Sequence, residues 1–220
     1  MTDPFSSVQP LIEAVEQAET ATALLAATSQ LASHLASSPP PAPQAINALV
    51  QVLGFNNPGA AVAAVDGLIA CGEAAVAPLL DNLDAHNYGA RAWAVRALAG
   101  IGDVRGLELL EQALGGDIGP SVRRAAARGL GQLRCADRPA DERALIQGRA
   151  LRALEAAAAD GEWVVRYAVV VGLESLGAQL GAAEAALQEV LAILQPLQAA
   201  PEPVLVVQLR ARQAVERLSR

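Results

Sequence analysis

The sequence contains no lysine, few aromatic residues and only two cysteines. All 16 basic side chains are arginines, and Phe, Trp and Tyr make up 3% of the 220 residues. Cys71 and Cys135 are too few and too far apart to form a disulfide framework or a zinc cluster. We therefore expect a reducing compartment, the cytoplasm, and no bound metal.

Long apolar runs and an excess of positive charge are also missing. No apolar run reaches the roughly 18 residues of a membrane span, since 164–173 is interrupted by Arg166, and no basic residue precedes Arg91. We expect neither a membrane span nor a signal peptide. The formal net charge of -7 argues against a nucleic-acid partner. Eight of the 23 acidic residues precede Arg91, so the two ends of the chain differ in charge, which serves either partner orientation or solubility alone.

Hydrophobic residues make up 53% of the chain, and they recur in aligned segments. Four segments share a leucine that recurs after 30, 32 and 43 residues, with a small or apolar residue four positions before it. An apolar residue follows three positions after the leucine, and spacings of four and three define one face of a helix. The leucines are Leu68, Leu98, Leu130 and Leu173; the residues four positions earlier are Ala64, Ala94, Ala126 and Val169.

Each aligned segment is predicted to be the second helix of a pair. The first helices are expected at 73–83, 104–114, 144–158 and 182–197, and a last helix at 203–218. Glycines at the expected helix C-termini are predicted caps: Gly72, Gly102 and Gly177. Helix pairs at this spacing predict an all-α fold, an alpha-alpha superhelix of HEAT-like repeats.

The chain is expected to form one repeat domain over residues 1–220. Residues 37–43, SSPPPAP, are predicted to be a rigid linker between an N-terminal helix pair within 1–36 and the main array at 44–220. The polar insertion 134–143, which contains Pro139, is expected to be an exposed loop.

An arginine column runs through the repeats at Arg91, Arg123 and Arg166, and Ala61 takes its place in the first repeat. Asp117 and Asp160 stand six residues before their arginines, a spacing typical of an Asp–Arg ladder between neighbouring repeats. We interpret Arg123 and Arg166 as ladder residues. The alternative is that they bind an anion.

The residues show no nucleophile elbow, phosphate loop or metal-ligand cluster, so no catalytic residue is predicted. Cys71 lies in a core column, and Cys135 is expected to be exposed. Tyr88 and Trp163 occupy one repeat position at the start of a second helix, where Pro58 and Pro120 stand in the other repeats. Aromatic faces beside arginines suit a flat conjugated carboxylate ligand or a protein hot spot.

Three motifs carry a family resemblance: NYGARAWAVRALAGIGD (87–103), DIGPSVRRAAARGLGQL (117–133) and DGEWVVRYAVVVGLE (160–174). The chain resembles the F-type subunits of cyanobacterial phycocyanobilin lyases over about residues 57–176. The resemblance implies a heterodimer with an E-type HEAT-repeat subunit, which attaches a linear tetrapyrrole to a cysteine of the phycocyanin alpha subunit. The bilin enters as substrate, and no further cofactor is expected.

For such a ligand the predicted binding set combines arginines for the propionates, carboxylates for the pyrrole N–H groups and aromatic walls for the conjugated plane. The set is Tyr88, Arg91, Trp93, Arg96, Asp103, Arg128, Glu162, Trp163 and Tyr167. Trp93 is alternatively a core residue. A non-catalytic HEAT-repeat chaperone or adaptor for phycobiliprotein assembly or phycobilisome turnover is the alternative function, because the fold does not separate these roles.

Overall fold

The computed structural model describes residues 4–37, 40–82, 87–180 and 184–220, and every regular element within them is helical. The chain forms two compact units, unit 1 (Met1–Ile101) and unit 2 (Gly102–Arg220). Each unit consists of paired helices in two layers, which confirms the all-α repeat fold. The structure thus divides the chain between Ile101 and Gly102, whereas the sequence suggested a boundary at 37–43.

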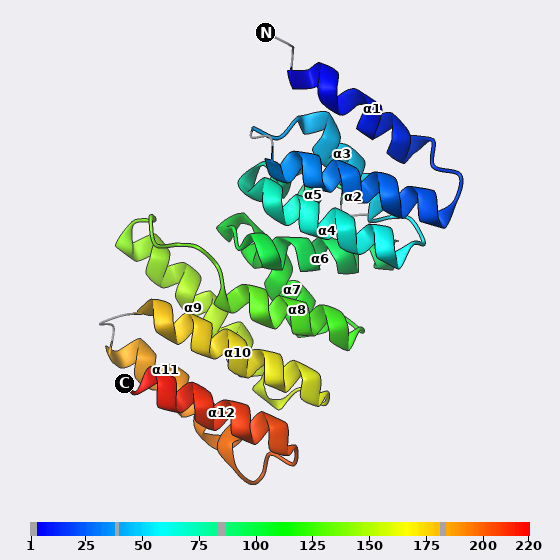
Figure 1. The fold of residues 1–220 in the computed structure, drawn as a ribbon. Helices are drawn as coiled ribbons and strands as arrows, with labels where there is room; N and C mark the ends of the chain where they lie inside the picture. Colours follow the sequence, from blue (N-terminus) through cyan, green and yellow to red (C-terminus); the bar gives the residue numbers. More distant parts are fainter. Residues whose placement is uncertain (1–3, 38–39, 83–86, 181–183) are drawn as a thin grey trace. The chain divides into compact units, whose positions relative to one another are not determined.

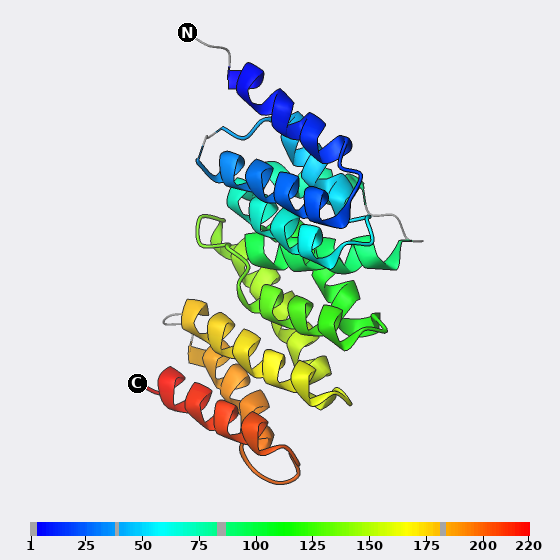
Figure 2. The same ribbon diagram turned by 45° about the vertical axis from the view of Figure 1, so that its right-hand side comes forward.

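Unit 1 places the second helices α2, α4 and α6 side by side, with α3 and α5 in a second layer and α1 packed against α2 and α3 (Figures 1 and 2). The N-terminal pair α1 and α2 therefore belongs to the same stack as the repeats that follow, because α2 packs on α4 as α4 packs on α6. The elements are α1 (Pro4–Glu16), α2 (Ala21–Ser37), α3 (Pro43–Val52), α4 (Pro58–Cys71), η1 (Gly72–Ala75), α5 (Val76–Asp81) and α6 (Tyr88–Ile101).

Unit 2 repeats this arrangement, with α8, α10 and α12 in one layer and α7, α9 and α11 in the other (Figures 1 and 2). Short 3-10 turns precede or follow the first helices. The elements are η2 (Val104–Gly106), α7 (Leu107–Gly116), α8 (Pro120–Gly131), α9 (Ala140–Ala156), η3 (Ala157–Ala159), α10 (Trp163–Leu180), α11 (Glu184–Leu194), η4 (Gln195–Gln198) and α12 (Leu205–Leu218).

The predicted leucine and alanine columns form the core of both units. Every member of these two columns is buried. Small residues let the second helices approach closely, most of all where α8 meets α10. A Cβ atom added at Gly131 would lie 2.1 Å from the carbonyl oxygen of Gly172, so the two backbones are in direct contact there. This contact fixes the spacing of the helices that carry the unit 2 surface described below.

The predicted second-helix starts are confirmed, because α4, α6, α8 and α10 begin at the four aligned positions. Gly72 (φ 59°) and Gly102 (φ 70°) end helices in a left-handed conformation that favours glycine, as predicted. The prediction for Gly177 is wrong, because this residue lies inside α10. A Cβ atom there would lie 2.9 Å from the Leu218 side chain, so Gly177 provides close packing against α12.

The insertion 134–143 is a loop only as far as Pro139, since α9 already begins at Ala140. Proline is compatible with the residue that precedes a helix, which explains the early start. The expectation that Cys135 is exposed is wrong: its side chain is buried.

The segment Pro58–Asp81 is long and apolar enough, by length and composition, to cross a membrane. It is not one helix, because α4 ends at Cys71 and the chain turns at Gly72. Alone, α4 would span about 21 Å, less than the roughly 30 Å of a bilayer core. Since α4 packs against both α2 and α6, we assign the segment to the core of unit 1.

Candidate functional site

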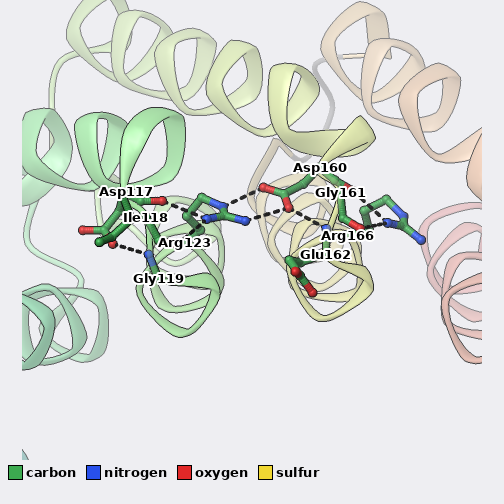
Figure 3. Close-up of polar contacts among 8 residues, drawn as sticks. All are labelled: Asp117, Ile118, Gly119, Arg123, Asp160, Gly161, Glu162 and Arg166. Carbon is green, nitrogen blue, oxygen red and sulfur yellow. Dashed lines mark hydrogen bonds and ion pairs between the residues drawn. The ribbon is translucent and has the colours of Figure 1, made fainter.

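An arginine–carboxylate ladder connects the loops that precede the second helices of unit 2 (Figure 3). Arg123 donates to both carboxylate oxygens of Asp160, at 2.7 and 3.0 Å, and to the carbonyl oxygen of Asp117 at 2.8 Å. Arg166 repeats the pattern one helix later. It donates to both oxygens of Glu202, at 2.7 and 2.8 Å, and to the carbonyl oxygen of Asp160 at 2.7 Å. The predicted ladder is confirmed.

The expected pairing of Arg123 with Asp117, the aspartate six residues before it, is wrong. Each arginine binds the backbone of its own loop and the carboxylate of the following repeat, so Arg123 pairs with Asp160 and not with Asp117. Glu202 was missed because it is a glutamate in a loop outside the aligned segments. Gln208 takes the arginine position in α12 and donates to the carbonyl oxygen of Glu202 at 2.6 Å. The ladder of unit 2 therefore ends in a neutral residue.

The ladder shifts the pKa values of its members. The hydrogen bonds from Arg123 hold the pKa of Asp160 below its usual value, against the opposing effect of burial. Those from Arg166 do the same for the pKa of Glu202. All four side chains are charged at neutral pH and bound to one another. They are structural residues, and their binding capacity is already used.

The second helices also present an exposed face, which we call the open face. It consists of the first, fifth and ninth residues of each second helix, which lie about one turn apart along the same side. None of these residues is buried in any of the six second helices. In α10 the open face begins with Trp163 and Tyr167; in α8 it includes Arg124 and Arg128.

The open face of unit 2 brings together three of the predicted ligand residues. Trp163 is 45% exposed at the start of α10, Tyr167 is half-buried one turn later, and Arg128 is exposed on the neighbouring helix α8. Arg124 lies one turn before Arg128, is also exposed, and was missed by the sequence reasoning. Its signal was available, since Arg124 aligns with Tyr167. Arg124 and Arg128 thus lie one turn apart on α8, which packs against the helix that carries Trp163 and Tyr167.

In unit 1 the predicted ligand residues all lie on α6. Tyr88 (44% exposed) and Arg96 are the first and ninth residues of the helix and lie on its open face. The Arg96 guanidinium carbon lies 5.6 Å from the centre of the half-buried Trp93 ring, a cation–π contact. Arg91 is half-buried, and its Nε has no hydrogen-bond partner among the described residues.

The two predicted carboxylates have different surroundings. Asp103 is buried and accepts hydrogen bonds from Arg105 Nε at 2.8 Å, from Nη2 at 2.7 Å and from the Arg105 backbone N–H. These bonds, led by the side-chain contact, lower the pKa of Asp103. Glu162 is exposed in the loop that precedes α10, next to Trp163 in the sequence. Glu162 is therefore accessible to a ligand, whereas the oxygens of Asp103 are already bound.

Comparison with known proteins identifies the family. Residues 76–174 match the model for HEAT repeats. Over 172 residues the chain is 50% identical to the phycocyanin alpha phycocyanobilin lyase CpcF of Synechocystis sp., and the match covers 78% of each chain. The chain belongs to the CpcF family of phycocyanobilin lyase subunits. The resemblance carried by the three motifs is thereby confirmed.

Two further comparisons agree with membership of the CpcF family. The phycobilisome maturation protein of Synechococcus elongatus is 46% identical over 212 residues, which cover 95% of this chain and 97% of the relative. A chain in the solved complex of CpcE and CpcF of phycocyanin lyase from Nostoc sp. PCC7120 aligns with a TM-score of 0.68 and 39% identity. The alignment covers 77% of this chain and 97% of the solved one.

The thiols of this CpcF-family chain are poor nucleophiles. Burial raises the pKa of Cys71 to about 11. Burial also raises the pKa of Cys135, although Arg143 partly opposes the shift. Both thiols stay protonated at neutral pH, and a thiol reacts far more slowly than a thiolate. His34 is half-buried in α2, and His86 lies outside the described residues.

Proposed function

We propose that this chain is one subunit of a heterodimeric bilin lyase. With an E-type partner it attaches phycocyanobilin, or a related linear tetrapyrrole, through a thioether bond to a cysteine of a phycobiliprotein alpha subunit. The bilin is the substrate, the reaction takes place in the cytoplasm, and no other cofactor is required. Membership of the CpcF family carries this proposal.

The open face of unit 2 supports bilin binding on this chain. Arg124 and Arg128 lie about 6 Å apart along α8, a spacing suited to two carboxylates. Trp163 and Tyr167 on the adjacent α10 offer ring faces to a conjugated plane. Because second helices pack about 8–10 Å apart, a single extended ligand can contact both helices. Glu162, exposed beside Trp163, is placed to accept a pyrrole N–H.

The state of the thiols indicates how the chain contributes to the reaction. With Cys71 and Cys135 protonated at neutral pH, the nucleophile is the acceptor cysteine, which adds to the ring A ethylidene of the bilin. The chain then contributes by holding the bilin in a fixed orientation and by supplying a proton. No covalent intermediate on this chain is required.

The test of heterodimer function uses recombinant chain, E-type subunit, apo-phycocyanin alpha subunit and bilin. We expect attachment, read by absorbance and zinc-induced fluorescence of the acceptor, only when both lyase subunits are present. Efficient and correct attachment by this chain alone contradicts the proposal. Stabilisation of apo-phycocyanin without any attachment favours the alternative role of chaperone or adaptor.

The test of the site uses Arg124→Ala/Arg128→Ala, with Arg152→Ala as the matched control. Arg152 is an exposed arginine on α9, in the other layer of unit 2. The double variant is expected to weaken bilin binding at least tenfold while its helicity and E-type binding remain unchanged. The control is expected to bind bilin like wild type. Equal binding by all three proteins would remove the arginine pair from the site.

The aromatic residues separate the two units. Tyr88→Ala and Trp163→Ala are both expected to fold, because both side chains are exposed at helix starts. Loss of bilin binding in Trp163→Ala alone places the ligand on unit 2, and loss in both extends it to unit 1. Unfolding of either variant, detected by circular dichroism, would assign that residue to the core.

A further inference from the structure

The open face of α12 differs from that of α8 and α10, because it is aliphatic. Leu205 and Leu209, the first and fifth residues of the helix, are 63% and 52% exposed, and Val206 beside them is 44% exposed. Leu205 and Leu209 occupy the positions that Trp163 and Tyr167 occupy on the adjacent α10. We call these three residues the aliphatic patch.

The patch is unsuited to the bilin itself. Its three side chains offer neither a cation for a propionate nor an acceptor for a pyrrole N–H. The nearest ladder arginine, Arg166, already has its Nε and Nη2 groups bound to Glu202 and its Nη1 to backbone oxygens. An aliphatic surface of this kind gains free energy from water exclusion, which is the driving force of protein association.

Its composition indicates a lasting partner. Neighbouring exposed leucines are a solubility liability unless they are covered. Permanent interfaces are larger and more apolar than transient ones, so the coverage fits an obligate subunit better than an acceptor that leaves after each turnover. A solved complex holds a CpcF chain together with CpcE.

Charge specifies the partner surface further. The rest of α12 carries Arg210, Arg212 and Arg217 against the single acidic residue Glu216. Arg210 and Arg217 both pair with Glu174 of α10, so the exposed Arg212 is the arginine of this half that has no carboxylate partner among the described residues. An apolar centre beside a basic half-helix fits a surface with an apolar centre and an acidic rim. Three aliphatic side chains are too small for a stable interface of roughly 800 Å² per partner, so the contact extends over this basic half.

We propose that the aliphatic patch and the basic half of α12 form the docking surface for the E-type subunit, through an apolar area of that subunit bordered by carboxylates. The inference rests on the proposed function only for the identity of the partner. It places the partner next to the aromatic residues of α10, so that a bilin on the open face of unit 2 lies at the edge of the heterodimer contact.

The experiment compares Leu209→Asp with Leu145→Asp in the full-length chain. Leu145 is 60% exposed on α9, in the other layer, and is the matched control. Both variants are expected to keep wild-type helicity and melting temperature, because both leucines are exposed. The dissociation constant for the purified E-type subunit, measured by calorimetry, is expected to rise at least tenfold for Leu209→Asp and less than threefold for Leu145→Asp.

The measurement is one of binding, so it does not depend on attachment activity. An unchanged dissociation constant for Leu209→Asp overturns the docking surface, even if the heterodimer is an active lyase. If E-type binding is unchanged and binding of apo-phycocyanin is lost, the surface belongs to the acceptor and the proposal is wrong. If Leu209→Asp loses E-type binding and the wild-type heterodimer attaches no bilin, the docking surface is confirmed and the proposed lyase function is wrong.

The role of the basic half of α12 is tested by the salt dependence of E-type binding. Association of the wild-type chain with the E-type subunit is expected to weaken as NaCl rises from about 50 to 300 mM, because the Debye length falls from roughly 14 Å to about 6 Å. Arg212→Glu is expected to weaken binding at low salt and to flatten this dependence. Binding that is independent of salt in both proteins contradicts the acidic rim.

Discussion

In unit 2 a guanidinium group at the fourth residue of α8 and of α10 binds the carboxylate of the next repeat, whereas unit 1 has nothing equivalent on α4. Its fourth residue is Ala61, which is buried. In α6 the fourth residue is Arg91, whose Nε has no hydrogen-bond partner among the described residues. Among the residues that the structure describes, the charge ladder therefore belongs to unit 2, in addition to the apolar packing that both units share.

The units also differ in how their helices touch. In unit 2, Gly131 and Gly172 bring two backbones into contact. In unit 1 a Cβ atom added at Gly67 would lie 3.0 Å from the Ala32 Cα atom of α2, and one added at Gly100 would meet the Ile69 side chain of α4, which can move. The contact between α8 and α10 is therefore tighter than these, and the helices that it joins carry the arginine pair and the aromatic pair.

The largest effect is expected from Arg166→Ala, which leaves Glu202 buried without its counter-charge. Breaking such a buried pair typically costs about 3–5 kcal/mol. Urea unfolding followed by circular dichroism measures the loss. The control is Arg138→Ala, which removes an exposed pair with Glu142 and should cost about 0–1 kcal/mol. Equal costs for the two variants would mean that the ladder does not stabilise unit 2.

Gly172→Ala and Gly100→Ala compare the helix contacts. In unit 2 the new Cβ would lie 2.4 Å from the carbonyl oxygen of Ala127, so the backbones must separate, at a cost of about 3 kcal/mol. In unit 1 the new Cβ meets the Ile69 Cδ1 atom, which can rotate away, and the change should stay within about 1 kcal/mol. The melting temperatures of the two variants measure the difference, and a larger loss for Gly100→Ala would refute it.

The smallest effect is expected from acid, which should lower the stability of unit 2 more than that of unit 1. Since the folded-state pKa values of Asp160 and Glu202 are lowered, their stabilisation is complete above the unfolded values of about 3.9 and 4.3 and is lost as pH falls through the folded values. Unit 2 should therefore lose stability below about pH 4, with little change between pH 5 and 8.

Each unit contains one tryptophan, which allows separate measurement. Trp93→Phe leaves Trp163 as the reporter of unit 2, and Trp163→Phe leaves Trp93 as the reporter of unit 1. Thermal unfolding followed by fluorescence at pH 7 and pH 3 should show the larger fall in the unit 2 midpoint. A larger fall in unit 1 would contradict the ladder as the source of the pH dependence.

The repeats, the helix starts and the existence of the ladder were predictable, because each depends on periodicity within the sequence. The carboxylate that Arg123 reaches was not predictable, because it depends on how far neighbouring helices are displaced along their axes. Arg124 was missed although it aligns with Tyr167 and lies one turn before the predicted Arg128. Gly177 was misassigned because α10 continues to Leu180, where packing against α12 overrides the local signal for a cap.

Gln208 gives the fourth position of α12 a side chain without charge. Arg123 and Arg166, at the same position of α8 and α10, each bind a carboxylate, so their contacts depend on the charge of Asp160 and Glu202. The Gln208 amide donates to the carbonyl oxygen of Glu202 instead. A carbonyl oxygen takes up no proton in the range where carboxylates titrate, so this contact persists in acid after the two ion pairs have weakened.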